Sequence, residues 1–368
     1  MVSVRDFLPD WASPPGDTIS DILRQRAVSP VEFASELGCS FEEARGILDG
    51  DTRITIGLAR DLNRLLGASV EFWMSRDDQY RQDLTRLEFE GRSWLRELPT
   101  SDMVKFDWIE QQANSALLVA ACLRFFGSRS IRSWRDTFDG LEQMAAFRTS
   151  ETFESSRGST AAWLRQGELE AAQIDCEPWD AERLEASLAQ MRTLTRIHDP
   201  KRFLPALQER CAESGVAVVV IRAPDGCRAS GATRFLSRQR ALIQLSFRYL
   251  TDDHFWFSFF HEVAHLILHA ESRLLPDETD EDGPWILEGD ERITTPDEEN
   301  ADQFAENILI PPDVQHELGQ IKLDHRSVIS FARRLGIAPG IVVGQLQHDG
   351  RLPHSHLNRL KRRFAWSD

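Results

Sequence analysis

The sequence has little cysteine and no long apolar run. Its five cysteines are an odd number, are widely spaced and include no Cys-x-x-Cys pair, which favours reduced core thiols over disulfides or a thiolate metal site. The longest apolar stretches are far shorter than the roughly 18–20 residues of a membrane-spanning helix. A basic N-terminal region followed by an apolar core and a small-residue cleavage site is also lacking. We therefore expect a cytoplasmic protein that does not contact a membrane.

Positive charge is in deficit. The 368 residues include 59 Asp and Glu against 43 Lys and Arg, which gives a formal net charge of −16. Because nucleic acids are polyanions, this balance argues against non-specific nucleic-acid binding over the whole surface. A hydrophobic content of 41% still supplies apolar side chains for buried cores, and the length predicts at least two domains.

Two helix-start signals follow each other closely near the N-terminus. Ser29 and Ser40 each precede a glutamate by three residues, Glu32 and Glu43, and this spacing lets the two side chains cap the free backbone amides of a helix start reciprocally. Gly38 lies between the two predicted helices, where a tight turn requires a left-handed backbone. The pattern predicts a helix-turn-helix.

The order of elements over about 70 residues resembles the Xre-type helix-turn-helix of HigA-like antitoxins and phage repressors. The flanking segments that extend the likeness are 19–23, 47–50, 58–67 and 69–73. The resemblance implies that the second helix of the motif contacts DNA or a protein partner, and it also fits pairing of two chains into a homodimer. The contact residues would be Ser40, Glu42, Glu43 and Arg45. Residues 1–80 hold eight Lys and Arg against fourteen Asp and Glu, so this charge disfavours DNA and favours a protein partner.

The rest of the chain divides by pattern. Residues 102–199 keep apolar side chains at helical spacing and carry no recognisable chemistry. After Leu204, three short segments rich in β-branched residues and bounded by turn residues predict a small sheet. These segments are 216–221, 231–236 and 242–247. We predict an α+β protein with an all-α helix-turn-helix domain at 1–85, a helical connecting domain at 86–200 and a third domain at 201–368.

Residues 252–270 predict one largely buried helix that contains His261-Glu262-Val263-Ala264-His265. Residues four apart share a helix face, so both imidazoles can bind one zinc ion. Glu262 then lies where a carboxylate can act as general base. Two histidines and a glutamate are costly to bury in so apolar a helix unless a metal ligates the imidazoles. The sequence therefore predicts a zinc site with Glu262 as the catalytic residue.

A catalytic zinc site requires a third protein ligand and an open position. His269 lies about 12 Å along the helix from His261, too far to bind the same ion, so we assign it a supporting or structural role. The segment from Glu298 to Asp302 resembles the second motif of gluzincin metallopeptidases. That likeness implies that Glu298 ligates zinc and that Asp302 steadies a ligand histidine. Glu299 stays open as the rival ligand, because spacing alone does not separate adjacent carboxylates.

The second half of the chain resembles the ImmA/IrrE family of metallopeptidases. The likeness is carried by segments 230–234, 245–248, 253–265 and 301–311. It implies a gluzincin-like domain in which the small sheet packs on the zinc-binding helix. Known members of the family cleave Xre-type repressors. The resemblance therefore implies a zinc-dependent endopeptidase with a regulatory role, whose protein substrate is a basic DNA-binding repressor.

Several points stay open at the level of sequence. The candidates for stabilising an oxyanion are Arg248, Tyr249, His254 and His325. The acidic segment 277–299 predicts either a solvated loop or a surface that recruits a basic partner, and strand 242–247 could offer an edge to an extended substrate. The main alternative function is a DNA-binding transcription regulator or antitoxin whose zinc module is structural or a sensor. A third is an inactive scaffold, against which Glu262 argues, since a structural zinc site needs no general base.

Overall fold

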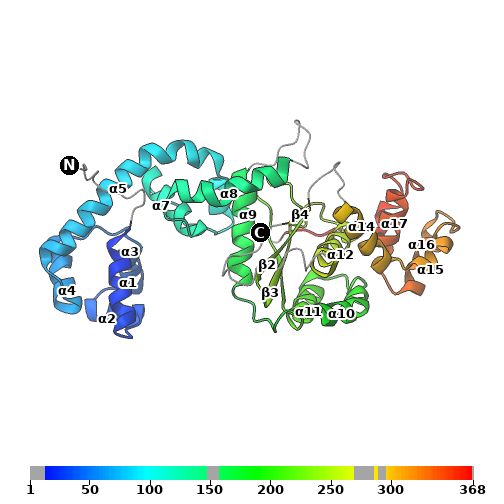
Figure 1. Ribbon diagram of the computed structural model, residues 1–368, viewed down its shortest axis with the longest axis horizontal. Coiled ribbons are helices and arrows are strands. Elements are labelled where there is room, and N and C mark those ends of the chain that lie inside the picture. Colours follow the sequence, from blue (N-terminus) through cyan, green and yellow to red (C-terminus); the bar gives the residue numbers. More distant parts are fainter. Residues whose placement is uncertain (1–12, 147–156, 269–285, 289–295, 367–368) are drawn as a thin grey trace, which may run out of the picture. The chain divides into compact units, whose positions relative to one another are not determined.

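Two compact units make up the chain in the computed structural model, residues 1–139 and 140–368. The structure describes residues 13–146, 157–268, 286–288 and 296–366 (Figure 1). Helices dominate both units and the second adds a small sheet, which confirms the predicted α+β class. The boundaries predicted at residues 85 and 200 are not the border between these units: the first falls inside a helix and the second begins one.

The first unit consists of helices whose starts follow from local sequence. In chain order they are α1 (Pro15–Gln25), α2 (Pro30–Leu37), α3 (Phe41–Leu48), α4 (Ile56–Leu66), α5 (Val70–Glu97), α6 (Thr100–Lys105), α7 (Ser115–Phe126) and α8 (Ile131–Ala146), whose end crosses into the second unit. Both predicted capping boxes are present, since Ser29 and Ser40 accept from the amides of Glu32 and Glu43 and each glutamate accepts in return. Gly38 ends α2 with a φ of +73°. The predicted pair of helices with a turn between them is therefore confirmed.

Two apolar clusters hold the first unit together. One is enclosed by α1–α4 and the start of α5, around Phe33, Leu62 and Trp73. The other is aromatic and joins α5, α7 and α8; its members include Trp94, Phe126 and Trp134. Because α5 contributes to both clusters, a boundary at residue 85 would divide a helix that packs as a whole.

The second unit contains a four-stranded sheet. Its strands are β1 (Val216–Val220), β2 (Gly231–Ser237), β3 (Arg240–Leu245) and β4 (Ile286–Glu288). Their order is β1-β3-β2-β4, with β1 and β3 parallel and the other pairs antiparallel. The three predicted strands are confirmed. The prediction that segment 242–247 offers a free edge is wrong, because β3 is an interior strand hydrogen-bonded to β1 and β2.

Helices surround this sheet and continue beyond it. They are α9 (Arg157–Ala171), α10 (Ala181–Leu194), α11 (Pro200–Ala212), α12 (Asp252–Leu268), α14 (Pro296–Leu309), α15 (Pro312–Leu318), α16 (His325–Leu335) and α17 (Pro339–His348), followed by a 3₁₀ turn at Asn358–Leu360. Across the described ranges, no single helix has both the length and the apolar character to cross a bilayer; only the bent pair of α16 and α17, counted together, meets both criteria.

The two faces of the sheet carry different helices, as the alternation along β2 shows. Thr233 contacts Glu262 of α12, whereas its neighbour Arg234 pairs with Glu168 of α9. Since successive strand residues point to opposite faces, α12 and α9 cover opposite faces of the sheet (Figure 1). α9 is largely buried, and it lies in the segment that the sequence assigned to a connecting domain. The structure instead makes it one layer of the second unit.

Candidate metal centre

α12 buries its polar residues within an apolar helix. His261 is 2% exposed, and Glu262 and His265 are fully buried. Phe259 and Phe260 flank them as part of the main core of the second unit. The predicted helix 252–270 is confirmed to Leu268. Its last two predicted residues, His269 and Ala270, lie outside the described residues. The helix thus places two imidazoles and a carboxylate where water does not solvate them.

α14 packs against α12 and brings a carboxylate to the two histidines. His261 Nε2 and His265 Nε2 are 3.0 Å apart. Glu298 Oε2 lies 3.1 Å from His261 Nε2, and Glu298 Oε1 lies 3.7 Å from His265 Nε2. Among the described residues these three form the one group of potential ligands close enough to hold a metal ion. The adjacent Glu299 is exposed, so the structure selects Glu298 from the two carboxylates that the sequence left open.

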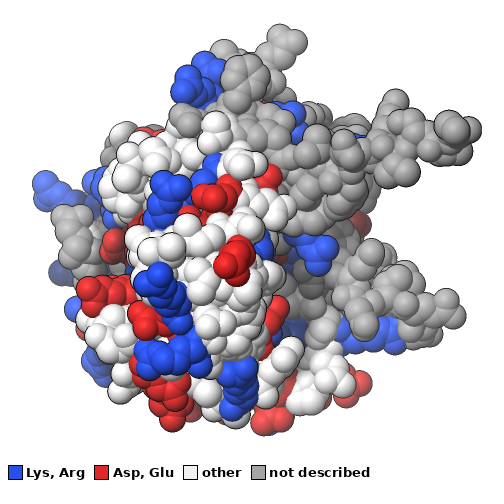
Figure 2. Space-filling model, turned by 90° about the vertical axis from the view of Figure 1, so that its left-hand side faces the viewer, with Lys and Arg blue, Asp and Glu red and all other residues white. Residues whose placement is uncertain are grey.

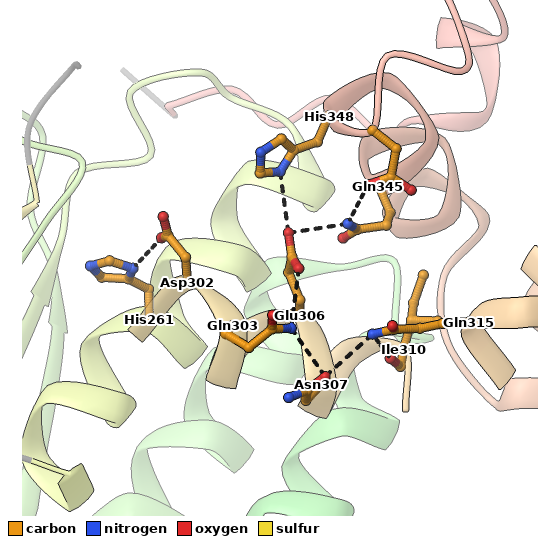
Figure 3. A network of polar contacts seen from close by, with 10 residues as sticks. His261, Asp302, Gln303, Glu306, Asn307, Ile310, Gln315, Gln345 and His348 are labelled. Atoms are coloured by element: carbon orange, nitrogen blue, oxygen red, sulfur yellow. Dashed lines mark hydrogen bonds and ion pairs between the residues drawn. The ribbon is translucent and has the colours of Figure 1, made fainter. Parts of the chain in front are cut away.

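Asp302 fixes the orientation of the first histidine. Its Oδ1 lies 2.8 Å from His261 Nδ1 (Figure 3). A carboxylate only accepts, so we assign the proton of the neutral ring to Nδ1. The lone pair of His261 Nε2 then faces a lone pair of Glu298 Oε2, with no proton between these two atoms. Asp302 therefore lies against His261, where the likeness to gluzincins leads us to expect it.

This donor set fits a divalent cation. Neighbouring lone pairs repel unless a positive charge lies between them, and a metal ion or a second proton on His261 would supply it. The 3.0 Å between the two Nε2 atoms is close to the roughly 3.3 Å expected for two nitrogens bound tetrahedrally to one zinc at about 2.0–2.1 Å. Two imidazoles and one carboxylate are also the ligands of one common class of catalytic zinc site. The group is thus a potential metal-binding triad.

β2 positions the carboxylate of Glu262. Thr233 Oγ1 donates a hydrogen bond to Glu262 Oε2. A Cβ at Gly231 would lie 2.4 Å from Glu262 Oε1, so only glycine leaves room for the carboxylate there. Both residues point to the same face of β2, because they are two positions apart. The sequence did not predict these roles. Gly231 and Thr233 belong to segment 230–234, which carries part of the family likeness, but no local pattern indicates that they contact Glu262.

A cavity of about 360 Å³ adjoins the metal centre. It lies among α12, the end of α14 and α17, and Asp302 and Ser230 are among its lining residues. Tyr249 and His254, two of the predicted oxyanion candidates, also line it and stack with ring centroids 4.3 Å apart. The other two do not line this cavity: Arg248 lines a smaller adjacent one, and His325 begins α16.

The first turn of α12 is tied to the C-terminal segment. Asp252 is fully buried, and its Oδ1 accepts from the backbone amide of Arg362 at 2.9 Å. Burial raises the pKa of Asp252 from 3.8 to about 6. Asp253 forms a buried ion pair with Lys361. These contacts anchor the helix that carries His261 and His265, two of the three potential metal ligands.

The predicted partner-contact residues lie in the first unit. Ser40 and Glu43 form the capping box of α3. The hydrogen bonds that the Ser40 backbone amide and hydroxyl donate to the Glu43 carboxylate lower its pKa. Arg45 pairs with Asp49 and Glu110. Figure 2 looks at the end of the molecule that bears α1–α4 and shows basic and acidic side chains interspersed among uncharged ones. The arrangement gives little to attract a phosphate backbone. Most of the acidic segment 277–299 lies outside the described residues.

Comparison with known proteins does not assign this chain to a family. No protein-family model matches the chain, and no curated protein matches it either. The functional assignment therefore depends on the chemistry of the residues around His261, His265 and Glu298.

Proposed function

We propose that this protein is a zinc-dependent endopeptidase. The observation that carries the proposal is the convergence of His261 and His265 of α12 with Glu298 of α14, whose ligand atoms lie 3.0–3.7 Å from one another. Glu262 lies on α12 beside His261. Three protein ligands leave a fourth position open, as a catalytic zinc requires. A bound zinc ion would supply Lewis acidity to the scissile carbonyl and to the attacking water.

The residues of the chain perform the proton transfers in this proposal. Glu262 takes the proton of the attacking water and later delivers it to the leaving amine. Thr233 holds one oxygen of that carboxylate through its hydroxyl, and Asp302 keeps His261 in the tautomer whose Nε2 can ligate. The complete burial of Glu262 limits competition from bulk water for these bonds.

We further propose a regulatory protein substrate, an Xre-type repressor. The support is the likeness of the second half to ImmA/IrrE metallopeptidases and of the first 70 residues to Xre-type domains. Such a repressor carries a basic DNA-binding surface, and this chain has a net charge of −16, so long-range attraction favours their encounter. The scattered charges of α1–α4 favour the peptidase over the DNA-binding alternative.

A co-expression experiment tests this function. Bound zinc is measured in the purified wild type and in Glu262→Gln, and each is co-expressed with an Xre-type repressor whose cleavage is followed by mass spectrometry. We expect both proteins to hold one zinc and only the wild type to cleave. Glu299→Gln is the matched control, since it removes the same charge from an exposed position next to the site. Cleavage by Glu262→Gln at the wild-type rate would disprove the mechanism.

A further inference from the structure

We propose that the 360 Å³ cavity beside the metal centre is the subsite for a large, uncharged apolar side chain next to the scissile bond. This inference rests on the proposed peptidase function. Two residues of the cavity wall contact the metal centre. Asp302 is hydrogen-bonded to His261, and the ring centroid of Phe257 lies 6.1 Å from that of His261. A peptide held at the metal would therefore have this cavity within reach of an adjacent side chain.

The walls indicate the chemistry of that side chain. Phe257, Leu309 and Ile341 come from α12, α14 and α17 and supply the apolar part of a wall that also has polar residues. Leu309 and Ile341 are almost fully buried, so they form a fixed surface, whereas Phe257 is only half-buried. Sites of this size, at the lower end of the range for ligand pockets, suit one large side chain.

The charged groups of the wall already have partners. Lys361 pairs with Asp253, and Asp302 bonds His261. On the rim, His348 and Gln345 both contact Glu306, at 3.3 and 3.1 Å (Figure 3). A charged guest would lose its hydration without gaining a counter-ion, whereas leucine, methionine or phenylalanine would gain from burial alone. The cavity therefore discriminates by size and polarity.

The test uses N-acetyl amino-acid hydroxamates, whose hydroxamate binds zinc and whose side chain varies. Binding of the leucine, glycine, lysine and aspartate compounds to the zinc-loaded protein is measured by calorimetry. We expect the leucine compound to bind roughly tenfold or more tightly than the glycine compound, and the two charged compounds to gain nothing over glycine. In Phe257→Ala the leucine-to-glycine ratio should fall severalfold while the affinity for the glycine compound stays unchanged.

Phe41→Ala is the matched control, because it removes the same side chain from an exposed position in the first unit and should leave the ratio unchanged. Equal binding of all four compounds to the wild type, or tighter binding of a charged one, would overturn the subsite and leave the peptidase function standing. If no hydroxamate binds the zinc-loaded protein, the proposed metal centre fails, and the subsite fails with it. The wild-type ratio decides even if Phe257→Ala does not fold.

Discussion

Gly231 and Glu262 are in contact across the interface between β2 and α12, with room for a hydrogen at residue 231 and for nothing larger. A methyl group there would lie 2.4 Å from Oε1, 2.8 Å from Cγ and 2.9 Å from Cδ of the glutamate. The backbone of Gly231 is not in the left-handed region, so space alone requires glycine at this position. The contact makes β2 limit the positions open to the carboxylate of Glu262, the proposed general base.

Gly231→Ala should therefore impair cleavage more than folding. The methyl group forces the Glu262 carboxylate away from its position, and a shift of about 1 Å in a reacting group can cost on the order of a hundredfold in rate. Overpacking should lower the free energy of unfolding by about 1–3 kcal/mol. Cleavage assays and urea titrations measure the two effects. Gly57→Ala, whose new Cβ would lie 3.8 Å from Thr55 Oγ1, an ordinary van der Waals contact, is the control and should cleave normally.

Thr233 offers a second test of the same contact. Thr233→Val keeps the shape of the side chain and removes the donor to Glu262 Oε2, and a hydrogen bond to a charged group contributes about 1.5–3 kcal/mol. We expect kcat/KM for repressor cleavage to fall about ten- to a hundredfold. Thr233→Ser keeps the hydroxyl and should retain most of the activity. If serine proves as poor as valine, packing of the methyl group matters and the hydrogen bond does not.

The three acidic residues of α14 near the site should differ in their effect on zinc affinity. Asp302→Asn weakens the acceptor that orients His261, and loss of such a supporting contact typically costs about 10–100-fold in metal affinity. Glu298→Gln removes a ligand and should cost more. Glu299→Gln should bind zinc like the wild type, because its carboxylate is exposed. Competition with a chromogenic chelator measures all of these. Zinc loss in Glu299→Gln alone would mean that the neighbouring carboxylate is the ligand.

Asp252 predicts a pH dependence of stability. Because its pKa is raised from 3.8 to about 6 in the folded protein, the native state holds a proton that the unfolded state has lost between these values. Stability contributed by this group is therefore present below pH 4 and decreases as the pH rises to 6, by about 3 kcal/mol for a shift of about two units. Asp253 and the Arg362 guanidinium are the charged groups beside it.

The measurement is a comparison of urea unfolding for the wild type and Asp252→Asn from pH 4 to 7. Asparagine cannot titrate and keeps an oxygen that can accept from the Arg362 amide. The free energy of unfolding of the wild type should decrease relative to the variant between pH 4 and 6 and then run parallel to it. Parallel curves over the whole range would show that Asp252 does not titrate there.

What the sequence predicted well is what local rules determine. The capping boxes at Ser29 and Ser40, the helix from Asp252 and the first three strands are each encoded within a few consecutive residues. The four-residue spacing of His261 and His265 likewise fixes their common face without knowledge of the fold.

What it missed or left open depends on contacts between distant segments. The likeness to gluzincins favoured Glu298 and left Glu299 as a rival, and the packing of α14 on α12 brings Glu298 to the histidines. Strand order is also non-local: β3 follows β2 in the chain yet lies between it and β1, so the segment 242–247 could not be recognised as interior. For the same reason, the contact between Thr233 and Glu262, 29 residues apart, left no local signal.

The placement of α9 also bears on how this protein can be divided. Trp163 donates its indole N–H to the carbonyl of Ile221, just beyond β1, and Gln244 of β3 donates to the carbonyl of Trp163. A fragment cut at residue 201 would contain every proposed zinc ligand but would leave the back of the sheet bare, with a buried glutamine and several apolar side chains facing water. The shortest piece of the chain that could fold around the proposed metal centre by itself thus begins no later than Arg157.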